Sequence, residues 1–177
     1  DDGLKWGTYR SDTTTVFNIE IINWMPSSGG EVTTDGKPLG IDSDGVSRVA
    51  MAVDQLGIEF YGIDTLGSEP VLSSRFDLEG NAEQVKLTST GAFVSCDDFG
   101  AYFLSNSYIE SGQGSVTHFA EDLTVDHISV NGDIAVLSIG SKGIALYDVS
   151  DPLNPEPRED NVLIALSLLM AFLFNFL

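Results

Sequence analysis

Three glycines, Gly57, Gly100 and Gly143, are spaced 43 residues apart, and each begins an apolar segment. These segments read GIEFYGI, GAYFLSN and GIALYDV, and a second apolar segment precedes each glycine at the same distance: VAMAV, AFVSC and AVLSI. Further along, Phe76 and Phe119 are also 43 residues apart. Because several separate strings keep the same spacing, the chain is predicted to consist of similar structural units that follow one another.

Each repeat unit contains four short segments that are rich in Val, Ile, Phe and Tyr and bounded by turn-forming residues, which predicts four β-strands. The strands are typified, in order, by HISV at 127–130, AVLSI at 135–139, GIALYDV at 143–149 and VLSSRF at 71–76. No segment before residue 161 shows sustained helical periodicity. Four-stranded units that recur every ~40–45 residues are typical of β-propeller blades.

The predicted fold is therefore all-β: a β-propeller segment of about three to four blades over 1–158, followed by an apolar C-terminal helix. The predicted boundaries are a partial blade at 1–38, blades at 39–76 and 82–119, and a partial blade at 125–158. In the last unit, PEPRED stands where the fourth strand is expected. Since closed propellers have about four to eight blades, we expect an incomplete ring that is part of a larger one.

The stretch after the third strand of the last unit carries a family resemblance. The residues concerned are Leu146, Tyr147, Asp148, Val149, Ser150, Asp151, Pro152, Asn154 and Pro155. They resemble the LVIVD repeat, a blade motif of bacterial and archaeal surface or secreted proteins, whereas the earlier units keep only the strands. The resemblance implies an extracytoplasmic β-propeller without a common catalytic residue, and so a binding or structural role.

The residues of this stretch also predict a turn on physical grounds. Proline disfavours the helical conformation of the residue before it, so Pro152 and Pro155 keep Asp151 and Asn154 out of a helix. Asp and Ser side chains accept hydrogen bonds from their own backbone two residues on. The stretch is therefore expected to end the third strand and lead into the fourth.

The chain is strongly acidic, with 27 Asp and Glu against 8 Lys and Arg and a formal net charge of −19. A charge of this sign repels phosphate backbones, which excludes nucleic acid as a partner. A solvated acidic surface, as in secreted or salt-adapted proteins, is favoured over a specific cation site.

A cation site is nevertheless predicted in the connections between second and third strands. Asp54 and Asp97 lie 43 residues apart there, with Asp98 beside the second, although Gly140 replaces the third aspartate. Further carboxylates fall in the connections between units: Asp77, Glu79, Glu121 and Asp122. Such a group could hold Ca²⁺, which takes six to eight oxygen ligands, or a cationic partner. No other cofactor is expected.

Other chemical candidates are interpreted as structural. IDSDGVS at 41–47 lacks the acidic ligands of an EF-hand and is predicted to be a turn. His118 and His127 have no third ligand in the sequence and are interpreted as polar strand positions. Cys96, the single cysteine, lies in an apolar run and is expected to be buried.

The segment Asn161–Leu177 contains no charged residue. As a helix its seventeen residues would reach about 25 Å, slightly short of the ~30 Å hydrocarbon core of a bilayer. The leading interpretation is a tail anchor or stop-transfer segment. A buried terminal helix and the product of a truncated or frame-shifted reading frame remain as alternatives.

Together these features predict a non-catalytic repeat domain, extracellular or on the cell surface, that binds a protein or small ligand or serves a structural role. Two alternatives remain open. One is part of a propeller enzyme whose active site lies at the channel mouth, and the other is an intracellular scaffold used like a WD40 protein.

Overall fold

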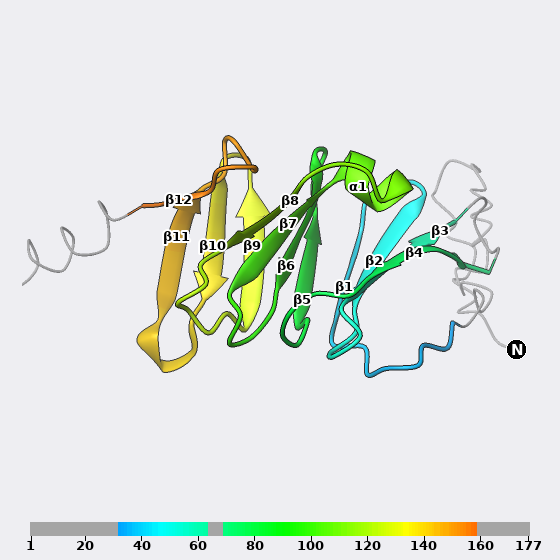
Figure 1. Ribbon diagram of the computed structural model, residues 1–177, viewed down its shortest axis with the longest axis horizontal. Coiled ribbons are helices and arrows are strands. Elements are labelled where there is room, and N and C mark those ends of the chain that lie inside the picture. The colour runs from blue at the N-terminus through cyan, green and yellow to red at the C-terminus, as the bar shows by residue number, and fades with distance from the viewer. Residues whose placement is uncertain (1–31, 64–68, 159–177) are drawn as a thin grey trace, which may run out of the picture.

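The computed structural model describes residues 32–63 and 69–158. This part of the chain is all-β and forms three four-stranded antiparallel sheets, which follow one another along the long axis of the molecule (Figure 1). The partial unit predicted at 1–38 lies almost wholly outside the described residues, and the apolar segment 161–177 lies entirely outside them.

Each sheet is built from consecutive strands paired in sequence order, as the repeat predicts. The first sheet contains β1 (Gly40–Ser43), β2 (Arg48–Ala52), β3 (Ile58–Gly62) and β4 (Val71–Phe76). The second contains β5 (Gln84–Leu87), β6 (Gly91–Ser95), β7 (Ala101–Ser105) and β8 (Val116–Phe119). The third contains β9 (His127–Asn131), β10 (Ile134–Ser138), β11 (Ile144–Asp148) and β12 (Glu156–Pro157).

The third sheet differs from the sequence-based expectation at its fourth strand. PEPRED is predicted to interrupt the unit, yet Glu156 and Pro157 pair with Asp148 and Tyr147 of β11. The pairing is tolerated because β12 is an edge strand, where a proline without an N–H breaks no ladder on its outer side. The backbone N–H of Arg158 then donates to the carbonyl of Leu146, which extends the contact by one residue.

A short helix that the sequence does not predict, α1 (Asn106–Ser111), lies between β7 and β8. Ser105 caps its first turn by accepting a hydrogen bond from the N–H of Tyr108, and Gly112 ends it in the left-handed conformation. With only six residues, the helix is too short to show a periodic pattern. It buries Ile109 against the core between the first two sheets.

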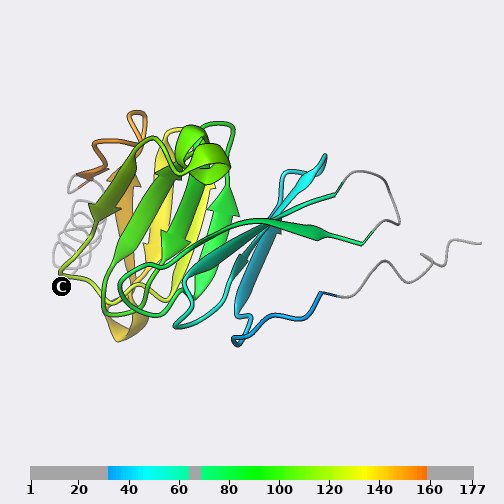
Figure 2. The same cartoon turned by 45° about the vertical axis from the view of Figure 1, so that its right-hand side comes forward.

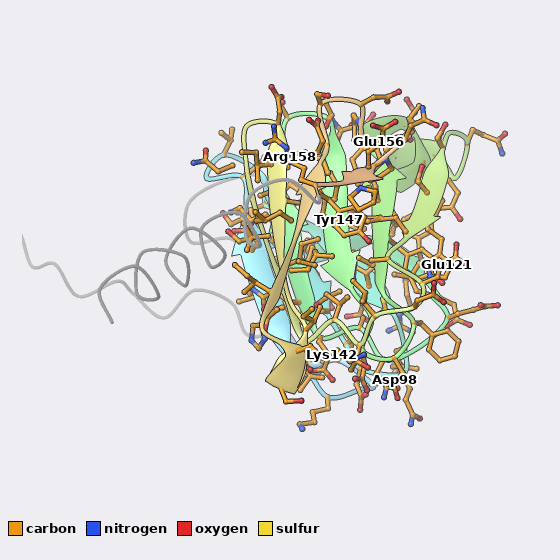
Figure 3. All side chains as sticks on the ribbon, turned by 90° about the vertical axis from the view of Figure 1, so that its left-hand side faces the viewer. Asp98, Glu121, Lys142, Tyr147, Glu156 and Arg158 are labelled. Atoms are coloured by element: carbon orange, nitrogen blue, oxygen red, sulfur yellow. The ribbon has the colours of Figure 1, made fainter. Side chains whose placement is uncertain are left out.

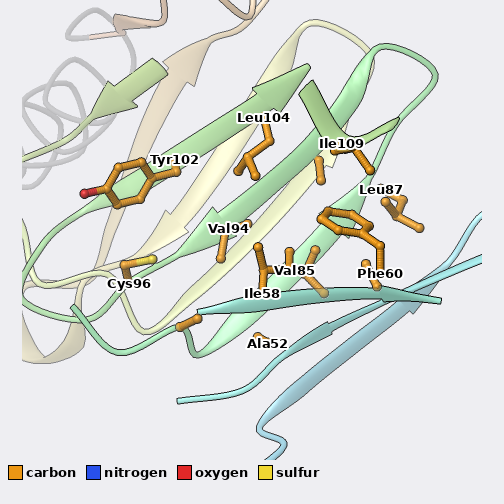
Figure 4. Close-up of a cluster of buried hydrophobic side chains, with 13 residues drawn as sticks. Ala52, Ile58, Phe60, Val85, Leu87, Val94, Cys96, Tyr102, Leu104 and Ile109 are labelled. Carbon is orange, nitrogen blue, oxygen red and sulfur yellow. The ribbon is translucent and has the colours of Figure 1, made fainter. Parts of the chain in front are cut away.

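Two apolar clusters join the sheets face to face. The first, between the first and second sheets, includes Ile58, Phe60, Val85, Val94 and Leu104 (Figure 4). The second lies between the second and third sheets, and its larger members are Phe93, Phe103, Phe119, Ile128, Leu137 and Tyr147. The middle sheet is therefore covered on both faces, which explains why its two central strands, β6 and β7, read as continuous apolar runs, whereas its edge strand β5 alternates.

Polar contacts add to this packing at the edges of the first interface. Asp42 of β1 accepts hydrogen bonds from Lys86 Nζ at 2.9 Å and from the N–H of Leu87 at 2.8 Å. Burial alone would raise the pKa of Asp42, but these hydrogen bonds hold it below its usual range. Arg48 reaches across to α1 and donates to Asn106 Oδ1 and Glu110 Oε1.

Within residues 32–63 and 69–158, no helix is long and apolar enough to cross a membrane.

Candidate functional site

The candidate site is built on the turns that join the second and third strands of each sheet. Asp54, Asp97 and Gly140 occupy the same position in these three turns, and all have positive φ angles, of 49°, 50° and 57°. Asp and Gly are among the residues that adopt this left-handed conformation readily. The pattern of two aspartates and one glycine is thus explained by backbone conformation.

These turns also connect neighbouring sheets. Asp54 forms a β-bridge with Ala82. The equivalent bridge, between Asp97 and Val125, has both of its residues 43 positions further along the chain. The carbonyl of Asp97 accepts from the N–H of Val125 at 2.8 Å. Each turn is therefore fixed to the residue that leads into the first strand of the next sheet.

The glycine that follows each turn allows the next connection to approach closely. Gly57 and Gly100 have φ angles of +76° and +75°, and a Cβ atom built on them would lie 2.2 Å from Phe76 O and 2.4 Å from Ala120 O. Only glycine leaves room for a backbone carbonyl at this distance. The turns between second and third strands and the connections between sheets lie at the same ends of the strands, on the side opposite α1 (Figure 1).

Two further carboxylates at repeat-equivalent positions follow these bridges. Glu83 and Asp126 directly follow the bridge residues Ala82 and Val125 and are 43 residues apart. The pKa of Glu83 is raised, first by partial burial and then by the negative charges of Asp97, Asp54 and Asp126, while Lys37 opposes the shift. We call Asp54, Glu83, Asp97 and Asp126 the acidic end.

The remaining predicted acids are more dispersed. Asp98 accepts a hydrogen bond from Thr124 Oγ1 at 2.8 Å, so its carboxylate faces the connection to the third sheet. Glu121 lies 3.7 Å from His118 Nδ1 and, with Asp122, lines an open hollow beside Tyr147. Figure 3 shows Asp98 and Lys142 at one end of the third sheet and Glu156 and Arg158 at the other.

Two members of the acidic end, Glu83 and Asp126, are not among the acids predicted from the sequence. Those are Asp54, Asp97 and Asp98 and, in the connections between units, Asp77, Glu79, Glu121 and Asp122. The sequence does contain a signal for them: Glu83 and Asp126 are 43 residues apart, and each directly precedes the first strand of its sheet. Within 32–63 and 69–158, no three His, Cys, Asp or Glu side chains are grouped so as to hold a metal ion. A cation site at Asp54, Asp97 and Asp98 stays a prediction.

The predicted turn within 41–47 lies between β1 and β2 at residues 44–47, whereas residues 41–43 belong to β1. Asp44 Oδ1 accepts hydrogen bonds from the N–H groups of Val46, Ser47 and Arg48, at 2.8 to 3.0 Å. The hydrogen bonds from the N–H groups of Arg48 and Val46 lower the pKa of Asp44. This carboxylate therefore serves to hold the backbone of its own turn.

The histidines and the cysteine have structural surroundings. The imidazole of His118 stacks on Tyr102, with ring centroids 4.2 Å apart and planes 2° from parallel. His127 is an exposed residue of β9. Cys96 is fully buried, as expected, and burial together with the nearby charge of Glu83 raises the pKa of its thiol to about 12. A thiol with that pKa is neutral at physiological pH and a poor nucleophile.

A scan against protein-family models and a search of curated proteins both found no match to this chain.

Proposed function

We propose that the chain is a β-propeller segment of a surface or secreted repeat protein, and that it binds a cationic partner at its acidic end without catalysing a reaction. The observation that carries the proposal is that Asp54 and Asp97, at equivalent turns that bridge to the next sheet, both act with Asp126 on the partly buried carboxyl of Glu83. Propellers and other repeat folds commonly bind through the loops that neighbouring units present on one face.

The arrangement of the sheets supports the interpretation as a propeller segment. β5 contacts both β1 and β9, so the first strands of successive sheets lie side by side along one line while the later strands extend away from it. Figure 2 shows the three sheets turned relative to one another about this line. This is the arrangement that blades adopt around a propeller axis.

The turn after β11 supports the resemblance to the LVIVD repeat. Ser150 N–H donates to Asp148 Oδ1 at 3.0 Å, and Leu153 N–H donates to Asp151 Oδ1 at 3.1 Å. Asn154 Nδ2 donates to the other oxygen of Asp151 at 2.7 Å. The polar residues of the motif thus stabilise a turn, which is consistent with a structural motif rather than a catalytic one.

Electrostatics favour a cation as the ligand. Glu83 experiences the charges of three neighbouring carboxylates, and Lys37 is the opposing positive charge that acts on it. A cation bound there would offset this repulsion and oppose the upward shift of the pKa of Glu83. A lysine-rich protein segment fits this chemistry. Calcium needs several oxygen ligands around one point, and residues 32–63 and 69–158 contain no group of three acidic side chains that could supply them.

Thermal unfolding of the full chain, with and without added CaCl₂ or an oligolysine peptide, tests the proposal. We expect one of the two to raise the melting temperature, and the variant Asp97→Asn to lose most of the rise, because Asn keeps the left-handed turn but removes the charge. Asp133→Asn, an exposed acid in the connection between β9 and β10 at the opposite end, is the control and should retain the rise. If neither cation changes the melting temperature, or if both variants behave alike, the acidic end is not a cation site.

A further inference from the structure

An open hollow of about 540 Å³ lies where the second and third sheets meet. Its walls come from the end of β8, the connection from β8 to β9, and the strands β11 and β12 with the connection between them. We call it the side hollow, and its lining includes Glu121, Asp122, Tyr147, Pro155 and Pro157. Figure 3 shows Tyr147 on β11 and Glu121 beside it.

The corresponding place between the first and second sheets is filled by apolar side chains. Leu78, which lies 43 residues before Glu121, packs against the first apolar cluster. The ring of Tyr108 from α1 lies on Phe76, with ring centroids 4.6 Å apart. Residues 149–155, which join β11 to β12, contain no helix. The side hollow is therefore particular to the second interface and is not a general property of the repeat.

Tyr147 brings an unpartnered polar group to the side hollow. The residue is only 9% exposed, and its ring packs edge-on against Phe119 with centroids 5.3 Å apart. Its pKa is raised first by burial and then by the charge of Asp122, so the hydroxyl lies on the same side as that carboxylate. No group within residues 32–63 and 69–158 forms a hydrogen bond with this hydroxyl. Because tyrosine hydroxyls in buried surroundings usually have a partner, this one is available to a ligand.

Two carboxylates stand at the rim of the side hollow. The N–H of Leu123 donates to the carbonyl of Ala120 at 2.9 Å, so Glu121 and Asp122 occupy the central positions of a tight turn. Both acids are exposed. Glu121 Oε1 lies 3.7 Å from His118 Nδ1, and no lysine or arginine is among the described residues that line the hollow. The rim is therefore rich in hydrogen-bond acceptors and carries negative charge.

The opposite wall is apolar and is held in place by β8. It consists of Pro155, which is half-buried, and Pro157, which is exposed. Thr117 Oγ1 of β8 donates to the carbonyl of Leu153 at 3.3 Å, which ties the connection between β11 and β12 to the second sheet. The two walls of the hollow are thus joined directly.

We propose that the side hollow binds an arginine side chain of a protein partner. A guanidinium group has five N–H donors and a fixed positive charge, and Glu121, Asp122 and the hydroxyl of Tyr147 all accept hydrogen bonds. The apolar stem of arginine can lie along Pro155 and Pro157. Lysine fits less well, because its compact and strongly hydrated ammonium does not spread its donors over several separate acceptors.

The charge of the rim favours an arginine within a protein over free arginine. The free amino acid carries an α-carboxylate, which Glu121 and Asp122 repel, whereas the backbone of a protein segment is neutral. The net charge of −19 attracts a basic partner over a longer range. The proposal does not depend on cation binding at the acidic end, since the two sites share no residue.

A nuclear magnetic resonance titration of the isotope-labelled full chain with N-acetyl-arginine amide tests the proposal. A ligand of this size should bind with a dissociation constant of about 1 mM, and the backbone signals of 121–123 and Tyr147 should shift. N-acetyl-citrulline amide has the same shape but no charge, and it should bind at least about tenfold more weakly. Free arginine and N-acetyl-lysine amide should also bind more weakly than N-acetyl-arginine amide.

Four variants locate the binding. Asp122→Asn removes one charge, and Tyr147→Phe removes the hydroxyl but keeps the ring on Phe119; each should weaken binding of N-acetyl-arginine amide by about three- to tenfold. Asp133→Asn, an exposed acid at the opposite end of the strands, is the matched control and should leave binding unchanged. Asp97→Asn, in the acidic end, should also leave it unchanged, which separates this site from the proposed cation site.

Several results would overturn the proposal. Equal binding of the arginine and citrulline compounds would show that no cation is recognised, and equal binding of the lysine compound would remove the guanidinium preference. Signal shifts centred on Asp54 and Asp97 would place the binding at the acidic end. Tighter binding of free arginine would assign the hollow to the amino acid. Unchanged affinity in both Asp122→Asn and Tyr147→Phe, or no shift at about 20 mM ligand, would mean that the side hollow binds no arginine.

Discussion

The glycines of the repeat allow a sharp test of the packing at the acidic end. Gly100 has φ +75°, and a Cβ atom there would lie 2.4 Å from Ala120 O and 2.7 Å from Phe119 O. Gly45, in the turn between β1 and β2, has nearly the same φ of +73° but nothing within 4 Å of its Cβ position. Alanine substitutions at the two positions therefore share the backbone strain and differ in the available space.

The magnitudes follow from these two contributions. Alanine in the left-handed region costs about 1–2 kcal/mol, and the reduced entropy of the unfolded chain returns roughly 0.5–1 kcal/mol, so Gly45→Ala should destabilise the protein by about 1 kcal/mol. In Gly100→Ala the clash is with backbone atoms, which cannot rotate away, and overpacking of this kind adds about 1–3 kcal/mol. We expect Gly100→Ala to lose about 2–4 kcal/mol in total.

Urea unfolding followed by far-UV circular dichroism measures both variants. A difference of about 2 kcal/mol corresponds to a shift of roughly 1 M in the urea midpoint at the m-values of small proteins. Gly57→Ala should behave like Gly100→Ala, because its Cβ would lie 2.2 Å from Phe76 O. If Gly100→Ala is no less stable than Gly45→Ala, the close approach of the two connections is wrong, and with it the geometry of the acidic end.

Three further predictions concern ionisable groups. Asp42→Asn should lower the free energy of unfolding by about 1 kcal/mol at neutral pH, because it weakens the hydrogen bonds with Lys86 and the backbone. Since folding lowers the pKa of Asp42, the urea midpoints of the variant and the unmodified protein should converge as the pH falls through that lowered value. Arg75→Met should lower the urea midpoint more than the double variant Arg75→Met/Glu59→Gln, because the single change leaves the carboxylate of Glu59, which is 0% exposed, without its cation; equal midpoints would contradict this interpretation. Glu83→Gln should raise the melting temperature at neutral pH, because folding raises the pKa of Glu83 and its ionised form is disfavoured; the gain should vanish below the ordinary Glu pKa of 4.5, and a gain that persists there would have another cause.

Much of the strand pattern can be predicted because the repeat encodes it locally. Phe76 and Phe119, aligned from spacing alone, both sit at the ends of fourth strands, opposite Ile58 and Ala101. The turn at Asp44 is likewise predictable, since it depends on side chains that bond their own neighbouring backbone. In both cases the determining interactions lie within a few residues or within one strand pair.

Other features cannot be read from local patterns. The helix α1 is stabilised by a single cap and by burial of Ile109 against two sheets, and neither leaves a periodic signal in six residues. β12 depends on the edge of β11 being available, which overrides the poor strand propensity of Glu156 and Pro157. The burial of Glu59 depends on Arg75 and Tyr61, which are its neighbours only after the sheet has formed.

The sequence by itself determined the unit of this protein: a 43-residue repeat with four strands, the glycines that its turns require, and a strong excess of negative charge. Each of these properties depends on a short stretch of sequence or on a sum over residues, so it can be recognised without knowledge of the fold. Only the tertiary structure decided which carboxylates act on Glu83, because the bridges Asp54–Ala82 and Asp97–Val125 join neighbouring sheets and bring Asp54, Asp97 and Asp126 within range of it. It likewise decided that Phe93, Ala101 and Phe103 of the middle sheet are covered by the third sheet, because this contact exists only once the two sheets have packed.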